Sequence, residues 1–232
     1  DLHIRKGPIR TTLVAEHECV EPPRRFVDRQ KSGPFRAWRH EHRFTAMAGG
    51  AELSDRIEFE LPFGAVGRAL LARTMMKEIA RQFDFRHRRT SADLARHAEI
   101  AARFGARRMR VGVTGASGLV GKQLSAFLST GGHEVVRFVR GTANGPAEIA
   151  WNPRDAEHGV DPAALDSLDA VVHLAGAGIA EGRWTPERKR EILESRVLGT
   201  QAIARGLARA ASRPRVLVSA SAIGFYGDRG GD

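Results

Sequence analysis

Cysteine, tyrosine and long apolar runs are scarce in this sequence. One cysteine, Cys19, stands among 232 residues, which excludes an internal disulfide and a cysteine-based metal site. Such sparse cysteine usage is typical of a reducing compartment, so we expect the cytoplasm. No apolar run reaches the roughly 18 residues that a membrane-spanning helix needs, and no secretory signal follows Asp1. We therefore expect no membrane span.

Acidic side chains are fewer than basic ones. The chain holds 37 Lys and Arg against 27 Asp and Glu, a net charge of +10. Residues 1–108 carry 22 basic and 14 acidic side chains, whereas residues 109–232 carry 15 and 13. A basic surface attracts nucleic acid, acidic lipid or an acidic partner. The arginines are scattered and no nucleic-acid motif accompanies them, so we interpret them as solvated and expect no nucleic-acid partner.

A strand, a glycine-rich loop and a helix follow one another between Arg110 and about Leu128. In such a unit Gly115 permits a tight turn, Gly118 lets a pyrophosphate approach the backbone, and Gly121 lets the helix pack close to its strand. The free N–H groups and the dipole at the helix start favour phosphate. The order of elements predicts a dinucleotide-phosphate site, with a glycine-rich turn that binds nothing as the alternative.

A second strand, from Glu134, ends with basic residues. An acidic residue at this strand end would bind the 2′-hydroxyl of NAD, whereas an arginine accommodates the 2′-phosphate of NADP. The sequence offers Arg137 and Arg140 there, and no Asp or Glu at the strand end. A guanidinium binds phosphate in bidentate fashion. We therefore expect NADP(H) in preference to NAD(H), and the alternative is that both arginines are merely solvated.

Further strands and helices alternate along the second half of the chain. The apolar strand that begins at Asp169 ends in the small residues 175–178, which leave room for a cofactor at the carboxyl end of a sheet. A helix beginning after Thr185 and a strand from Arg215 follow. This alternation predicts an α/β fold, a Rossmann-type doubly wound parallel sheet.

The first half of the chain follows a different pattern. Residues 1–62 alternate as antiparallel strands do, with a hairpin signal at Gly49–Gly50, and a helical period runs from about Gly67 to Ile100. We predict a partial α+β domain over residues 1–100, a linker over 101–108 and a nucleotide-binding domain over 109–232.

Two histidines, His40 and His42, stand two apart in one predicted strand and therefore face the same side. They could form half of a metal site, but no other ligand has a recognisable spacing. We interpret them as hydrated histidines on a sheet and expect no metal site.

The N-terminal half resembles the C-terminal half of START-like (polyketide cyclase/dehydrase) domains. The resemblance rests on residues 26–35 and 38–44, the hairpin and the long closing helix. It implies a helix that lies across a curved antiparallel sheet, and an apolar ligand in the cavity between them. The opening part of such a domain would precede Asp1, so we expect a fragment of a longer protein.

The C-terminal half resembles the extended short-chain dehydrogenase/reductase superfamily, in its nucleoside-diphosphate-sugar epimerase-like branch. Four motifs carry this resemblance, at residues 114–121, 173–176, 197–200 and 218–228. The resemblance implies a nucleotide cofactor and a small-molecule substrate. It also implies that Ser221 is the catalytic serine, which hydrogen-bonds the reacting carbonyl or hydroxyl. Together with the strand-end arginines, the expected cofactor-binding residues are Gly115, Ser117, Gly118, Leu119, Val120, Gly121, Arg137, Arg140, Leu174, Ala175, Gly176 and Ser219.

Three departures from that superfamily bear on function. One is that the substrate-binding C-terminal part does not follow within the sequence, so we expect the nucleotide-binding domain to be C-terminally incomplete at Asp232. The superfamily's general acid/base is the tyrosine of Tyr-x-x-x-Lys, but Tyr226 is the single tyrosine here and Gly230 stands four residues later. Arg196 stands where many relatives carry an asparagine. We expect an NADP(H)-dependent epimerase or reductase in the intact parent protein. A non-catalytic nucleotide sensor and an apolar-ligand-binding module remain the alternatives.

Overall fold

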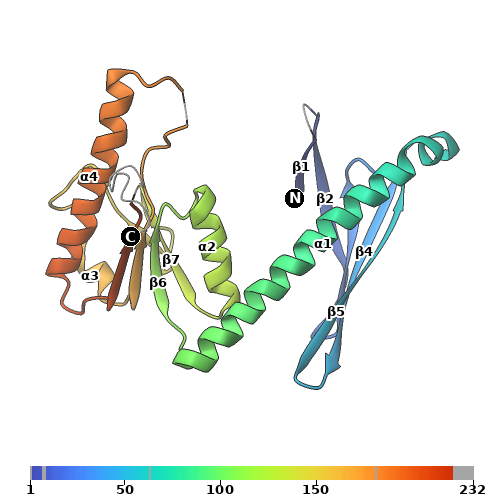
Figure 1. The fold of residues 1–232 in the computed structure, drawn as a ribbon, viewed down its shortest axis with the longest axis horizontal. Coiled ribbons are helices and arrows are strands. Elements are labelled where there is room, and N and C mark those ends of the chain that lie inside the picture. The colour runs from blue at the N-terminus through green and yellow to red at the C-terminus, as the bar shows by residue number, and fades with distance from the viewer. Residues whose placement is uncertain (1, 7–8, 63, 181, 222–232) are drawn as a thin grey trace, which may run out of the picture. The chain divides into compact units, whose positions relative to one another are not determined.

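The chain folds into two compact units, residues 1–89 and residues 90–232. The computed structural model in Figure 1 describes residues 2–6, 9–62, 64–180 and 182–221. No helix in these ranges combines the length and the apolar character needed to cross a bilayer.

Unit 1 is built on a five-stranded antiparallel sheet with its strands in chain order. Gly49 has a φ of +84° in the turn between the last two strands, a value that glycine adopts readily. This confirms the predicted hairpin. The strands are β1 (Leu2–Lys6), β2 (Ile9–Glu21), β3 (Arg25–Ser32), β4 (Ala37–Met47) and β5 (Gly50–Glu60).

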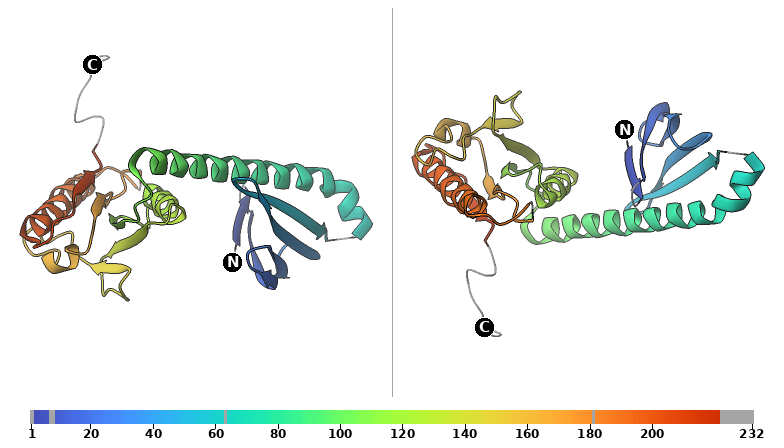
Figure 2. Two further views of the ribbon diagram at one scale, coloured as in Figure 1. Left: turned by 90° about the horizontal axis from the view of Figure 1, so that it is seen from below. Right: turned by 90° about the horizontal axis from the view of Figure 1, so that it is seen from above.

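A single long helix follows the sheet, α1 (Gly64–Phe104). Its part within unit 1 lies along one face of the sheet (Figure 2). The helix continues four residues past the expected end at Ile100, so residues 101–104 are helical and only 105–109 form an irregular connection. The division between the two compact units falls within α1, between residues 89 and 90. The domain limits 1–100, 101–108 and 109–232 stay a prediction.

Unit 2 is built on a parallel sheet in the order β10-β9-β6-β7-β8. Read from β8, this is the 3-2-1-4-5 order of a doubly wound nucleotide-binding fold, which confirms the predicted Rossmann-type architecture. The strands are β6 (Arg110–Thr114), β7 (Glu134–Val139), β8 (Glu148–Ala150), β9 (Ala170–His173) and β10 (Val216–Ser219), and the helices are α2 (Leu119–Thr130), α3 (Pro162–Leu165) and α4 (Pro186–Arg209).

Helices cover both faces of this sheet (Figure 1). On one face Leu124 of α2 packs against the buried Val111 and Val113 of β6. On the other, Ile203 of α4 packs into a core that includes Val171 of β9. Burying each such side chain contributes about 1.5–3 kcal/mol. The two apolar layers cover β6 and β9, which are neighbours in the sheet. The loops that follow these two strands form the candidate site.

Candidate functional site

The glycine loop after β6 is tightly packed at its glycines. Gly115 has a φ of +66°, and a Cβ on it would lie 3.0 Å from the backbone of Leu174 and Ala175. The N–H of Gly118 donates to the carbonyl oxygen of Gly115 at 2.9 Å and closes the turn. A Cβ on Gly121 would overlap that same carbonyl oxygen. The loop therefore brings bare backbone to the start of α2, as a bound pyrophosphate requires.

The N-terminus of α2 lacks a side-chain cap. Its N-cap residue is Gly118, and its first turn holds no acidic residue, whereas Asp161 caps α3 and Thr185 caps α4. Helix geometry leaves the first N–H groups of α2 without intrahelical acceptors. Leu119 and Val120, in this turn, are 86% and 63% exposed, and Ser117 beside them is exposed too. The turn suits an anion such as a phosphate.

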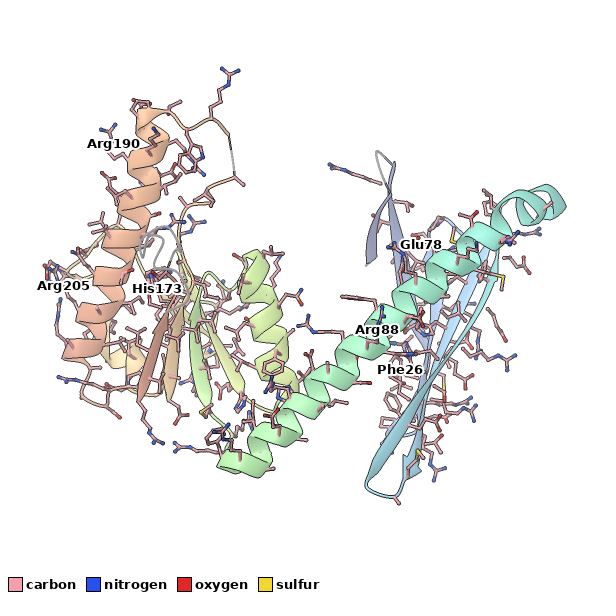
Figure 3. The ribbon with its side chains drawn as sticks, in the orientation of Figure 1. Phe26, Glu78, Arg88, His173, Arg190 and Arg205 are labelled. Carbon is pink, nitrogen blue, oxygen red and sulfur yellow. The ribbon has the colours of Figure 1, made fainter. Side chains whose placement is uncertain are left out.

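Thr114, at the end of β6, holds the loop that follows β9. Its Oγ1 accepts hydrogen bonds from the N–H groups of Leu174 at 3.0 Å and Ala175 at 3.1 Å. It also lies 2.8 Å from Nδ1 of His173, the buried residue labelled in Figure 3. With both lone pairs of Oγ1 engaged, the hydroxyl donates to Nδ1. Burial lowers the pKa of His173, so the imidazole is neutral and accepts this bond.

The sequence motif alone did not assign this role to Thr114. A hydroxyl residue directly before the first glycine was the available signal, but its partners lie about 60 residues away. As a result Leu174 and Ala175, which are expected to contact the cofactor, lie directly beside Gly115.

The two arginines at the end of the second strand differ in their surroundings. Arg137, on β7, donates to Oε1 of Glu148 at 2.7 Å and is thereby engaged with a carboxylate. Arg140 follows β7 and lines an open hollow of about 380 Å³, together with Trp151. Asp161 also lines it, but its carboxylate caps α3. Within the described ranges, no acidic side chain pairs with Arg140, so Arg140 is the better placed of the two for a phosphate.

Helix α4 ties down the loop after β9. Oγ of Ser195 accepts from the N–H of Ala177 at 2.9 Å, and Nη1 of Arg196 donates to the carbonyl of Ala177 at 3.2 Å. A Cβ on Gly176 would lie 3.4 Å from Cζ of Arg196, so the guanidinium covers this glycine. Arg196 thus fixes the loop beside the candidate site.

Ser219, the last residue of β10, and Ser221 just after it lie next to the end of β9. Ser219 pairs with His173 in the sheet register, and the N–H of Ala220 donates to the carbonyl of His173 at 3.0 Å. Ser219 and Ser221 are both exposed. The structure therefore brings Ser221 to the carboxyl end of the parallel sheet, where the glycine loop also lies. Tyr226 lies outside the described residues.

The interpretation of His40 and His42 as hydrated histidines is wrong. Each is only 4% exposed, because they lie on the covered face of the unit 1 sheet. Phe83 of α1 contacts His40 edge-on, and Phe26, labelled in Figure 3, stacks on His42. Burial lowers the pKa of both histidines, and for His42 the neighbouring His40 lowers it further. Both rings are therefore neutral and shielded from water.

Comparison with known proteins extends over both units. A crystal structure described as the nucleoside-diphosphate sugar epimerase from Corynebacterium glutamicum is similar to 97% of this chain, with 32% identity and a TM-score of 0.71, and the chain covers 45% of it. Epimerase family protein Mb2239 of Mycobacterium bovis is 39% identical over 118 residues, which are 51% of this chain and 38% of that protein.

Epimerase family protein SDR39U1 of Homo sapiens is 33% identical over 120 residues, again 51% of this chain and 38% of that protein. The chain thus spans well under half the length of these curated relatives. The model of the NAD dependent epimerase/dehydratase family matches residues 111–232, which is more than half of the chain and includes all of the unit 2 sheet except Arg110. The chain belongs to the NAD dependent epimerase/dehydratase family.

Proposed function

We propose that this chain binds NADP(H) and serves a short-chain dehydrogenase-type, nucleoside-diphosphate-sugar epimerase-like oxidoreductase. Family membership supports a nicotinamide cofactor. The observation that carries the proposal is the uncapped start of α2 behind a glycine loop in which a Cβ would overlap backbone at Gly121 and be strained at Gly115. These features fit a pyrophosphate, which needs bare backbone and unpaired N–H groups.

The choice of NADP(H) over NAD(H) rests on Arg140. It follows β7, the strand whose end meets the adenosine ribose in this fold. Arg140 lines the hollow beside Trp151, and its guanidinium has no acidic partner in the described part of the chain. We assign the 2′-phosphate to Arg140, with Arg137 held by Glu148 as a lesser contributor.

Ser221 is the proposed catalytic residue. It lies two residues beyond β10, at the carboxyl end of the sheet, where the glycine loop also begins. When bound, the nicotinamide would accept or donate a hydride at a substrate carbon. The hydroxyl of Ser221 would hydrogen-bond the reacting oxygen of a small-molecule substrate. Residues 174–176, of which Leu174 and Ala175 are held by Thr114, would border the cofactor.

A second proposal concerns unit 1, on the strength of the START-like resemblance. One long helix lies along an antiparallel sheet there, the arrangement in which such domains enclose an apolar ligand. Trp38 and Phe59 pair across β4 and β5, but the buried His40 and His42 interrupt the apolar surface. The apolar-ligand role therefore has less support than the nucleotide site.

Titration with NADPH, followed by its fluorescence, tests the first proposal. We expect saturable binding by the wild-type chain, and a Kd at least about tenfold higher for Gly118→Ala, because about 1.4 kcal/mol of phosphate contact is lost. Gly50→Ala is the matched control, since a Cβ there meets nothing within 4 Å. Absence of binding at high micromolar NADPH, or equal affinity for Gly118→Ala and wild type, would refute the proposal.

A further inference from the structure

The covered face of the unit 1 sheet holds a compact group of metal-ligating side chains. His40 and His42 stand two residues apart on β4, so both side chains point to this face. Asp55 on β5 is the direct sheet partner of His42. It lies on the same face of β5 as the apolar residues Leu53, Ile57 and Phe59, so a carboxylate stands in the middle of an otherwise apolar face. The side chain of Asp55 is 3% exposed.

The donor atoms of these three residues converge. Nε2 of His40 lies 2.8 Å and Nδ1 of His42 lies 2.7 Å from the same oxygen, Oδ1 of Asp55. All three ligand atoms lie within 4.8 Å of one another. Ligands of tetrahedral zinc stand about 3.3 Å apart at bond lengths of about 2.0–2.1 Å, so shifts of about half an ångström would admit the ion.

His42 carries the observation that a hydrogen-bond network does not explain. Its Nδ1 is buried and close to Oδ1 of Asp55, yet it makes no hydrogen bond within the described residues. A buried polar atom without a partner costs about 1–3 kcal/mol, and such atoms are rare in native proteins. The nitrogen therefore lies close to a carboxylate oxygen without the alignment that a hydrogen bond needs. Two ligands that share a cation have this arrangement.

The surroundings are those of a built site. Phe26 stacks on the His42 ring at a centroid distance of 4.0 Å, and Phe83 contacts the His40 ring at 5.1 Å. Nε2 of His87, on α1, lies 2.7 Å from Oδ2 of Asp55, the oxygen that the other histidines leave free. A partner of this kind orients a ligating carboxylate.

One feature competes with a cation. Nη1 of Arg86 lies 3.8 Å from Oδ1 of Asp55, so its charge already offsets part of the carboxylate charge. The Arg86 side chain is 44% exposed, and no direct hydrogen bond joins it to Asp55. Its guanidinium lies over the Phe83 ring, 5.6 Å from the centroid, and is not a direct partner of the carboxylate.

We propose that His40, His42 and Asp55 form a binding site for one divalent transition-metal ion, Zn²⁺, with His87 as the positioning residue of the Asp55 carboxylate. Two imidazoles and one carboxylate are a donor set that zinc sites use, with the remaining coordination position left to water. The proposal replaces the expectation of no metal site, and it is independent of the nucleotide site in unit 2.

Metal uptake by untagged full chain tests this proposal. The protein is treated with EDTA, desalted, dialysed against micromolar Zn²⁺ and analysed by plasma mass spectrometry, with Co²⁺ titration as an optical probe. We expect one Zn²⁺ per chain, visible Co²⁺ absorption typical of low coordination number, and a higher Tm with Zn²⁺. His42→Gln and Asp55→Asn should lose stoichiometric binding.

The matched control is His158→Gln, because His158 is an exposed histidine of unit 2 and takes no part in this cluster. It should bind Zn²⁺ as wild type does. If the buried variants fail to fold, His87→Gln carries the test, since this side chain is 46% exposed. It should weaken Zn²⁺ binding about 10- to 100-fold. Less than stoichiometric uptake by wild type, or unchanged affinity in His87→Gln and the folded buried variants, would overturn the proposal.

Discussion

A hydrogen bond of 2.8 Å between Oγ1 of Thr114 and Nδ1 of His173 joins the ends of β6 and β9. Thr114 is fully buried and His173 is 3% exposed. The same hydroxyl oxygen receives two backbone N–H groups from the loop after β9. One side chain thus positions the glycine loop and the loop opposite it.

Replacing Thr114 by valine should destabilise unit 2. The substitution keeps the shape but leaves two N–H groups and an imidazole nitrogen without a partner, at a cost of about 2–4 kcal/mol. Urea unfolding followed by circular dichroism measures this. Thr114→Ser, which keeps the hydroxyl, should recover most of the loss. Thr200→Val, on the exposed side of α4, should stay within about 0.5 kcal/mol of wild type. Equal stability of the valine and serine variants would contradict the account.

Gly121→Ala should disturb the junction of β6 and α2. The added methyl would overlap the carbonyl oxygen of Gly115, so the helix must move away from its strand. Overpacking of this kind costs about 1–3 kcal/mol. The thermal midpoint should fall and NADPH binding should weaken, whereas Gly50→Ala, with open space around it, should change neither. A Gly121→Ala variant as stable as wild type would show that the helix start is looser than described.

Ser195→Ala should loosen the loop after β9. It removes the acceptor of the Ala177 N–H and leaves Arg196 as the remaining tie to that residue. The loss of one such bond is worth about 0.5–1.5 kcal/mol, so we expect NADPH affinity to fall by about two- to tenfold. Isothermal titration calorimetry measures the change. Unaltered affinity would mean that this loop does not border the cofactor.

Acid should destabilise unit 2 through His173. Burial lowers the pKa of this histidine in the folded state below its unfolded value of about 6.5. As pH falls through that range the unfolded chain binds the proton first, so stability is complete above about pH 6.5 and declines below it. Between pH 7.5 and 5.5, His173→Asn should lose less stability than wild type, by up to about 1.4 kcal/mol per pH unit. Parallel losses in urea unfolding would exclude His173 as the cause.

Local sequence was sufficient to predict the architecture and the glycine loop. The strand, the three glycines and the helix lie within about a dozen residues, and the jobs of Gly115 and Gly121 follow from backbone geometry that neighbours in sequence determine. The hairpin at Gly49–Gly50 was predictable for the same reason.

Long-range pairing set the limit of prediction. Arg137 and Arg140 look alike in sequence, but only the parallel pairing of β7 with β8 brings Glu148 to Arg137. Likewise, the sequence around His40 does not predict its neighbours Asp55 and His87. Asp55 reaches it through the register of β4 with β5, and His87 belongs to the cluster because α1 folds over the sheet. Partners that depend on register and packing are not encoded by local periodicity.

Calorimetric comparison of NADPH and NADH binding to wild type and Arg140→Leu tests the central claim most directly. An arginine–phosphate contact is a charge-assisted bond worth about 1.5–3 kcal/mol. We predict that wild type binds NADPH at least about tenfold more tightly than NADH. Arg140→Leu should lose that preference and keep its NADH affinity, while Arg137→Leu should retain most of it. Equal affinity of wild type for the two cofactors, or binding of neither, would contradict the account.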